Sequence, residues 1–218
     1  MYIPRPFEVS DLPEIKKFVA HVGSADLITV DSSGVPVATL MPCQWIEDET
    51  EFGRLIMHMS KGNAQWKEIL PNQIGLAIVH GVQAYISPSN YVSKSETGKV
   101  VPTWNYTSAH LTGTLTVSHD QEELLNIVSE LTDFHEHNQS NPWKVTDAPS
   151  DYLVSQLNGI VGITMRISKV EAKAKLNQNR SSADRQGVIE TLLASEKFED
   201  NEVANLMTTD EKPINKLI

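Results

Sequence analysis

The sequence predicts a mainly β protein of the α+β class, built as a small antiparallel barrel with peripheral helices. β-rich runs dominate the middle of the chain, and short turns join them, which argues against the strand and helix alternation of a parallel sheet. The long apolar run at residues 74–87 carries Gly75 and Gly81. Glycine inside a strand often marks a bulge or a close backbone approach, as at the corner of a barrel.

The chain is expected to begin with a helix and a hairpin. Residues 11–22 form an amphipathic pattern, in which Asp11 is the candidate N-cap and Glu14 completes a capping box. Residues 26–42 contain two β-rich runs on either side of the turn signal at residues 31–34. We therefore predict that this segment folds as the first hairpin.

The remaining elements follow from periodicity and from turn residues. Further strands are expected at residues 54–60, 74–87, 103–119 and 159–176. Helices are expected from Asp120 to the Asn141-Pro142 stop, and at residues 61–70, 150–157, 182–194 and 199–207. The acidic residues 47–51 suggest a solvated turn. Residues 1–195 are predicted to form one domain and residues 196–218 a C-terminal helical tail, whose last ten residues are expected to fray.

Composition excludes several classes of function. The single cysteine, Cys43, rules out an internal disulfide framework and a cysteine-based zinc site, so a reducing cytoplasm is the expected location. The formal net charge of −10 opposes binding to a nucleic-acid backbone, and a DNA partner would need a local basic patch. No apolar run approaches the ~20 residues that span a bilayer, so no membrane association is expected.

The segment from His58 to Asn63 is the first candidate site. It lies where a strand is expected to end and a short helix to begin, and the unpaired N–H groups of a helix N-terminus suit a phosphate. Lys61 and His58 would add positive charge and hydrogen bonds. In the alternative reading, Ser60 or Asn63 only caps the helix and Lys61 is solvated.

The segment from Lys175 to Arg180 is the second candidate. Its amides, which include Asn179, and the guanidinium of Arg180 could bind phosphate or a chain of hydroxyl groups, since arginine offers a bidentate fork. The alternative is a strand-to-helix turn whose side chains bond the backbone.

The stretch from His80 to Gly113 is the third candidate, because aromatic rings lie there beside amides and hydroxyls. Such a mixture suits a planar polar ligand, and it also suits a subunit interface. Strand alternation places Trp104 and Tyr106 on one face and Asn105 on the other. Core packing of one of these faces remains the simpler reading.

No catalytic residue is assigned, and whether the chain is an enzyme stays open. His135 and His137 would lie roughly 200° apart on a helix and could not hold one metal ion, so no metal site is expected. Cys43 has apolar neighbours in sequence and is expected to be a buried, inert thiol.

Several of these motifs together resemble a known family. The opening MYIPRPFEV, the segment from His58 through GNAQW, the pair AYISPSNY and VPTWNY, and LNQNR near the end resemble the PaiB family, described as FMN-binding negative transcriptional regulators. The resemblance runs from Met1 to about Leu193, with the motifs in the family's order. It departs at three positions, where Asn90 stands for tryptophan and Val82 and Ala64 stand for proline.

The resemblance implies a split antiparallel barrel of the flavin-reductase-like type, forming a homodimer with FMN in grooves built from both subunits. On the phosphate and ribityl side, the implied contacts are Thr39, His58, Lys61 and Asn63. Two residues would close that side, Asn179 and Arg180. Two would approach the flavin ring, Trp104 and Asn105.

The resemblance also implies a role and an alternative. The role is that of a negative transcriptional regulator with a flavin-dependent redox function, although no helix-turn-helix pattern supports direct contact with DNA. The alternative is a haem-binding or haem-degrading protein, since similar split barrels bind haem between subunits. The candidate iron ligands would be His58, His80 and His110.

Overall fold

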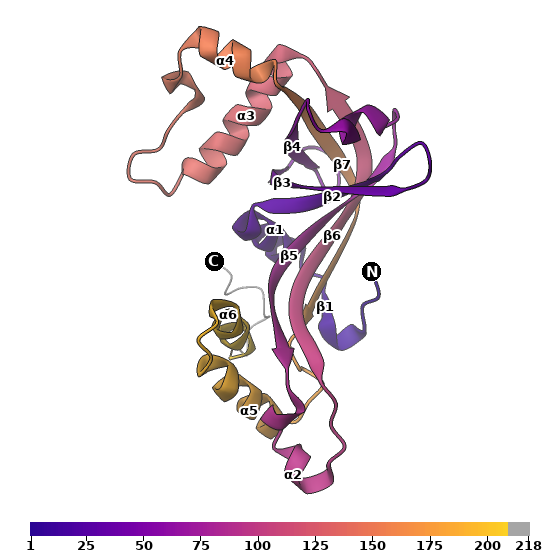
Figure 1. Cartoon of the computed structure of the whole chain (residues 1–218), viewed down its shortest axis with the longest axis vertical. Helices are drawn as coiled ribbons and strands as arrows, with labels where there is room; N and C mark the ends of the chain where they lie inside the picture. The colour runs from indigo at the N-terminus through magenta and orange to yellow at the C-terminus, as the bar shows by residue number, and fades with distance from the viewer. Residues whose placement is uncertain (209–218) are drawn as a thin grey trace. The chain divides into compact units, whose positions relative to one another are not determined.

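The computed structural model describes residues 1–208, which form two compact units (Figure 1). The barrel unit comprises Gly23–Val79 and His110–Val170, and the terminal unit comprises Met1–Val22, His80–Ala109 and the described part of Glu171–Ile218. Three strands contribute residues to both units: β5 (Ile74–Ile86), β6 (Thr103–Ser118) and β7 (Ile160–Lys175). The boundary predicted after residue 195 stays a prediction, and the predicted fraying concerns residues 209–218, outside the described residues.

The strands form one antiparallel sheet that closes on itself. Its order is β1-β7-β4-β3-β2-β5-β6, and an additional pairing joins β6 to β7. The shorter strands are β1 (Glu8–Val9), β2 (Ser24–Val30), β3 (Pro36–Ile46) and β4 (Arg54–Ser60). The closing pair turns the order into a ring, with β1 attached to β7 outside it. This arrangement confirms the predicted mainly β fold with antiparallel strands.

The predicted elements of the barrel unit are present, with one difference in type. Helices α3 (Gln121–Glu136) and α4 (Ser150–Leu157) lie near the expected positions, and η4 (Val145–Asp147) is an additional short 3₁₀ helix between them. The helix predicted over residues 61–70 is a 3₁₀ helix, η2 (Ala64–Glu68). It is short because Asn63 caps its start and the chain turns at Pro71.

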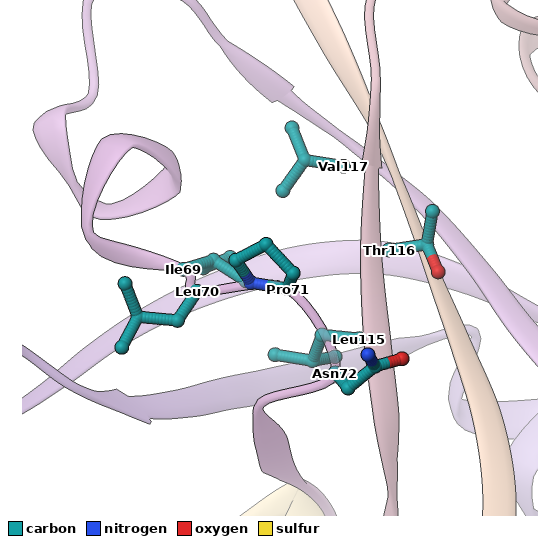
Figure 2. A pocket seen from close by; sticks show the side chains of 7 residues that line it. All are labelled: Ile69, Leu70, Pro71, Asn72, Leu115, Thr116 and Val117. Atoms are coloured by element: carbon teal, nitrogen blue, oxygen red, sulfur yellow. The ribbon is translucent and has the colours of Figure 1, made fainter.

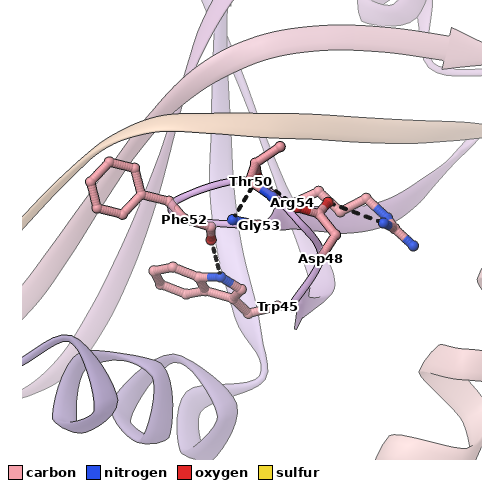
Figure 3. Close-up of polar contacts among 6 residues, drawn as sticks. All are labelled: Trp45, Asp48, Thr50, Phe52, Gly53 and Arg54. Carbon is pink, nitrogen blue, oxygen red and sulfur yellow. Dashed lines mark hydrogen bonds and ion pairs between the residues drawn. The ribbon is translucent and has the colours of Figure 1, made fainter.

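The predicted hairpin and the acidic turn are both confirmed. Asp31 organises the β2–β3 turn, since its carboxylate accepts hydrogen bonds from the N–H groups of Ser33 and Val35 at 2.8 and 2.9 Å. In the β3–β4 turn, Asp48 accepts hydrogen bonds from Thr50 and from Arg54, and Figure 3 shows this cluster. The hydrogen bonds from Thr50 are the main reason why the pKa of Asp48 is lowered.

Glycines allow strands to approach closely, as the sequence predicted for residues 75 and 81. A Cβ atom on Gly75 would lie 2.6 Å from Leu115, and one on Gly81 would lie 2.0 Å from the hydroxyl of Thr107. A tight backbone approach also occurs at Gly113, where a Cβ atom would lie 2.3 Å from the carbonyl oxygen of Arg166. Gly113 is on β6 and Arg166 on β7, so the pair that closes the ring has no room for a side chain there.

The outward face of the barrel unit divides into two parts. Helix α3 covers the end formed by β3 and β4, where Ile127 and Leu131 pack on Ile56 and Ile46. Strand β3 farther along is uncovered, and its outward side chains are apolar and exposed: Pro36, Ala38, Leu40 and Pro42. On β2 the paired outward positions are apolar at Ile28 and Val30, but they are polar at Asp26, which pairs with Leu40, and at Ser24, which pairs with Pro42. On β5 they are apolar, at Leu76 and Ile78. We call this surface the apolar face.

The terminal unit carries the helices from both ends of the chain. They are η1 (Arg5–Phe7), α1 (Leu12–Val22), η3 (Pro88–Asn90), α2 (Ser93–Thr97), α5 (Ser182–Leu193) and α6 (Phe198–Met207). The cap predicted for α1 is present, since the Asp11 carboxylate accepts a hydrogen bond from the Glu14 N–H at 3.2 Å. Helices α5 and α6 pack against each other (Figure 1). No helix within residues 1–208 is both long and apolar enough to cross a membrane.

The closing strand pair gives a direct test of the barrel. Replacing Gly113 with alanine puts a Cβ atom against the Arg166 carbonyl, so β6 and β7 must separate. We expect the Gly113→Ala variant to lose about 1–3 kcal/mol or more of unfolding free energy, measured by chemical denaturation.

Gly62→Ala is the matched control, because the nearest atom to its added Cβ is the flexible Ser60 hydroxyl at 3.4 Å. This variant should change the unfolding free energy by less than about 0.5 kcal/mol. Equal stability of the two variants would contradict the close approach of β6 and β7.

Candidate functional site

Two of the predicted phosphate-side residues, Thr39 and Asn63, lie in direct contact. The Asn63 side-chain amide donates a hydrogen bond to the Thr39 hydroxyl at 2.8 Å, and its oxygen accepts one from the Gln65 N–H at 3.0 Å. The Thr39 hydroxyl in turn donates to the side-chain oxygen of Gln65 at 2.5 Å. The Thr39 proton is therefore engaged, and this hydroxyl can only accept a hydrogen bond from a ligand.

Gln65 is the centre of this cluster, and the sequence reasoning missed it. Its side chain is buried, and its amide nitrogen donates to Leu27 O, Thr29 Oγ1 and Val37 O at 3.0, 3.1 and 3.2 Å. One amide thus ties η2 to β2 and β3. The available signal was the Asn-Ala-Gln spacing, in which a capping asparagine holds the residue two positions later.

Lys61 is fixed by its backbone and leaves its ammonium group available. Its N–H donates to Gly159 O at 2.9 Å, and its carbonyl accepts from the Trp66 indole at 3.2 Å. Within residues 1–208, no ion pair or hydrogen bond of the ammonium group is found. The side chain is half-buried beside Ser60 and Gly62, so it suits a phosphate or another anion.

His58 does not join Thr39 and Asn63. Cys43 pairs with Met57 across the β3–β4 ladder, so Thr39, Cys43 and Met57 share one face of the sheet. His58 follows Met57 and therefore points to the opposite, outward face. Burial lowers the pKa of His58, which favours the neutral imidazole.

Arg180, in the terminal unit, lies over an aromatic ring. Its guanidinium carbon is 4.6 Å from the centre of the Tyr91 ring, and Asn177, in the left-handed conformation, approaches the Tyr91 hydroxyl at 3.5 Å. Within the described residues, the guanidinium N–H groups have no hydrogen-bond acceptor. Asn179 is exposed beside it. This pair therefore offers a positioned guanidinium fork and a free amide.

Trp104 forms an exposed aromatic pair with Tyr85. The rings meet edge to face at 6.1 Å, and each side chain is 51% exposed. The Lys175 ammonium donates to the Trp104 carbonyl at 2.8 Å and also to the Thr103 hydroxyl, and burial lowers its pKa. The backbone under the indole is thus held, and the ring face remains open for stacking on a planar ligand.

Asn105 lies on the other face of β6, as alternation predicted, and it is fully buried. Its amide nitrogen contacts the sulfur of Met207 at 3.3 Å. Its oxygen has no hydrogen-bond partner among the described residues, and neither has the nearby Thr107 hydroxyl. The Asn105 side chain is therefore covered by α6 and turned away from the exposed rings.

The loop that carries Tyr91 is pinned to α5. The Asp184 carboxylate accepts hydrogen bonds from the Ser93 N–H and hydroxyl at 2.9 and 2.8 Å. The Asn90 carbonyl lies against Gly187, where a Cβ atom would be only 2.5 Å away. Asn90, the position where the resemblance expects tryptophan, thus uses its backbone to hold the loop. The Ser93 N–H is the main reason why the pKa of Asp184 is lowered.

Two further predictions concern the side chains that could bind a metal ion and the reactivity of the Cys43 thiol. No group of three or more His, Cys, Asp or Glu side chains within residues 1–208 could hold a metal ion. The thiol of Cys43 is buried as predicted, and burial raises its pKa to about 12, so it is not a nucleophile.

A hollow of about 290 Å³ in the barrel unit contains none of the predicted site residues. It lies between the η2–β5 connection and β6, and Figure 2 shows the side chains that line it: Ile69, Leu70, Pro71, Asn72, Leu115, Thr116 and Val117. It has no charged side chain, so it does not suit a phosphate.

Each of the two units contains residues that fit chemical groups of a flavin nucleotide. Exposed rings at Trp104 and Tyr85 suit a planar ring system. The Lys61 ammonium and the Arg180 guanidinium, which have no hydrogen-bond acceptor within residues 1–208, suit a phosphate, although Arg180 also contacts the Tyr91 ring and interacts with the Asp184 carboxylate. The amides of Asn63 and Asn179 suit the hydroxyl groups of a ribityl chain. His58 and the Asn105 side chain do not belong to these sets in the structure.

Comparison with known proteins also points to a flavin nucleotide. The model of a family described as "Putative FMN-binding domain" matches residues 1–169. The protease synthase and sporulation protein PAI 2 of Bacillus subtilis, known as PaiB, is 31% identical over 207 residues, which cover 95% of this chain and 96% of the relative. The predicted resemblance to PaiB is confirmed.

Solved structures support the barrel fold. A FAD- and haem-binding protein from Mycobacterium smegmatis superposes with a TM-score of 0.57 and 16% identity, over 77% of this chain and 73% of the other. The flavocytochrome Anf3 from Azotobacter vinelandii superposes with a TM-score of 0.53 and 14% identity, over 77% of this chain and 68% of the other. These similarities establish a split-barrel fold.

The pinned loop gives a test that depends on pH. The folded-state pKa of Asp184 is lowered, so its contribution to stability is present above the unfolded pKa of about 3.9 and is lost as pH falls through the folded pKa. Asp184→Asn should destabilise the protein at pH 7, and the difference from wild type should shrink steadily below about pH 4. Unfolding free energies from pH 2.5 to 7 measure this.

Asp133→Asn, on the exposed side of α3, is the control and should follow the wild type across the pH range. If the difference in unfolding free energy between the wild type and Asp184→Asn stayed constant with pH, the role of the carboxylate charge would be contradicted.

Proposed function

The chain belongs to the FMN-binding domain family that includes PaiB, and on this premise we propose that it is an FMN-binding split-barrel protein that works as a homodimer. The observation that carries the proposal is the open aromatic pair together with two cations that have no acceptor within residues 1–208. When bound, FMN would supply one- or two-electron redox chemistry. The protein's part would be to bind the flavin, orient it and exclude water.

The flavin ring would be held in the terminal unit. Trp104 offers an exposed indole face, and the Lys175 hydrogen bond fixes the backbone that carries it. Stacking of a planar ring on such a face is favourable because it removes apolar area from water on both sides. Tyr85 would contact the edge of the ring.

Each unit offers a phosphate one cation whose backbone is already fixed. Lys61 in the barrel unit is tied to Gly159, and Arg180 in the terminal unit is tied to Asn177, so each would lose little backbone freedom on binding. Asn63 and Asn179 would bond the ribityl hydroxyls. Thr39 would orient Asn63 rather than donate to the ligand, since its proton already goes to Gln65.

The homodimer is supported by the apolar face. Leu40 is 66% exposed at its centre, and the outward positions of β3 from Pro36 to Pro42 are apolar, while Asp26 lies opposite Leu40 on β2. Large exposed apolar surfaces mark interaction sites in soluble proteins. A second copy of the chain is the proposed partner, because its apolar face is the matching surface that a two-fold interface requires.

The other implied roles are less well supported. Of the candidate iron ligands, His80 and His110 already have interactions within the described residues, whereas the Nδ1 atom of His58 has no hydrogen-bond partner there. His58 is therefore the candidate that remains for the haem alternative. Direct DNA binding is opposed by the net charge of −10. The regulatory and redox functions implied by the resemblance therefore stay predictions, and they rest on the family name.

Comparing FMN with riboflavin, which lacks the phosphate, distinguishes residues that bind the phosphate from residues that bind the ring. Lys61→Gln and Arg180→Gln should each weaken FMN binding about tenfold or more, because each removes charge-assisted hydrogen bonds, while the affinity for riboflavin should stay unchanged. Trp104→Leu should weaken both flavins equally, since they share the ring. Quenching of flavin fluorescence on titration measures all of these affinities.

Lys67→Gln is the control, because Lys67 is an exposed lysine near Lys61 that lies over Trp66. It should bind FMN as the wild type does. Absence of FMN binding by the wild type at micromolar concentration would defeat the proposal, and a Soret band on haem titration in the same samples would favour the haem alternative.

The apolar face predicts a specific dimer-breaking substitution. Leu40→Glu places a charge at the centre of the proposed interface, so the variant should be a monomer where the wild type is a dimer, as measured by light scattering after size exclusion. Val154→Glu, at an exposed apolar position on α4, is the control and should stay dimeric. A Leu40→Glu variant with the wild-type mass would refute this interface.

A further inference from the structure

The barrel unit contains a second cavity, which the proposed flavin contacts do not use. It has a volume of about 350 Å³ and lies between the outward face of β4 and the helices α3, η4 and α4. We call it the helical pocket. Its apolar lining comes mainly from the helices: Val128, Trp143, Val145, Ala148, Leu153 and Leu157. The volume is at the low end of the ~300–1,000 Å³ typical of small-molecule sites.

Thr132 and Gln156 also line the pocket with polar side chains, but among the lining residues His58 is the one with a buried side-chain atom that lacks a hydrogen-bond partner. Strand alternation turns it to the outward face, and it lines the cavity. Its Nδ1 atom is buried without a hydrogen-bond partner, and neither ring nitrogen has one among the described residues. Buried polar atoms in folded proteins are nearly always hydrogen-bonded, so an atom like this one requires an explanation.

The residues that line the helical pocket favour an uncharged ligand. No Lys, Arg, Asp or Glu side chain lines the pocket, so an ionised ligand would lose its hydration without gaining a counter-charge. Burial also keeps His58 neutral by lowering its pKa. A neutral imidazole has one N–H donor and one nitrogen acceptor, and a hydroxyl group can match either of them.

The mouth of the pocket is aromatic and firmly attached. Trp143 and Tyr152 line it and are 46% and 57% exposed. The Trp143 N–H donates to the Glu136 carboxylate at 2.9 Å, which ties this rim to the end of α3. Exposed rings around an apolar cavity favour a flat apolar body over a flexible chain.

We infer that the helical pocket binds a small, uncharged aromatic molecule that carries one hydroxyl group, with the hydroxyl hydrogen-bonded to His58. The site is separate from the proposed flavin contacts, since Thr39 and Asn63 belong to the opposite face of the sheet. It assigns to His58 a role other than the phosphate contact implied by the family resemblance.

Three related probes test the inference by calorimetry on the full chain. 2-Naphthol has the ring and the hydroxyl, naphthalene lacks the hydroxyl, and 2-naphthoate carries a charge. The wild type should bind 2-naphthol about tenfold more tightly than naphthalene, and 2-naphthoate most weakly. His58→Phe should abolish the preference for 2-naphthol over naphthalene while keeping the affinity for naphthalene.

Ala148→Phe fills the cavity and should abolish binding of both uncharged probes, while FMN binding stays as in the wild type. This pattern separates the helical pocket from the flavin proposal. A second readout needs no variant: the ring-proton NMR signals of His58 in the wild type should shift on addition of 2-naphthol.

Three results would overturn the inference. They are an unchanged preference for 2-naphthol in His58→Phe, undiminished binding by Ala148→Phe, and a wild-type affinity for 2-naphthoate equal to that for 2-naphthol. An unmoved His58 signal at saturating 2-naphthol would also overturn it, even if the His58 variant failed to fold.

Discussion

The close approach of β6 to β7 at Gly113 is the constraint on which the barrel depends. Because the backbone of Arg166 occupies the space of a side chain there, the sheet closes into a ring and its strands are not left as unpaired edges. Closure gives every strand of the ring an inward and an outward face. Alternation along β3 and its register with β4 then put Thr39 on the same face as Cys43 and His58 on the opposite, outward face.

Helix α3 then divides the outward face into two surfaces with different uses. Where Ile127 and Leu131 cover Ile56, the apolar strand face becomes core, and the adjoining His58 is enclosed beneath helices. Where no helix of the described chain covers it, around Leu40, the same kind of apolar surface remains exposed. The outward face of the barrel strands therefore provides both the helical pocket and the proposed interface.

The polar groups of the candidate site are held by other polar groups before any ligand arrives. Gln65 fixes Thr39 and Asn63, while Asp184 fixes the loop that presents Tyr91 to Arg180. Because Gln65 and Asp184 already hold these groups in place, a ligand that binds them costs less conformational entropy. Within residues 1–208 the Lys61 ammonium and the Arg180 guanidinium have no hydrogen-bond acceptor, although Arg180 also contacts the Tyr91 ring and interacts with the Asp184 carboxylate. Both cations therefore keep hydrogen-bond donors for an anion.

The sequence by itself determined the elements and their caps, because these depend on residues a few positions apart. Asp11, Asp31 and Asn63 act where local spacing predicted, and alternation correctly separated Trp104 from Asn105. Only the tertiary structure decided which face of each strand is covered, since that depends on the β3–β4 register and on where α3 packs. The sequence could not show that His58 leaves the Thr39 cluster, that Gln65 joins it, or that Asp184 holds Ser93. These facts arise from contacts between residues far apart along the chain, which local patterns do not encode.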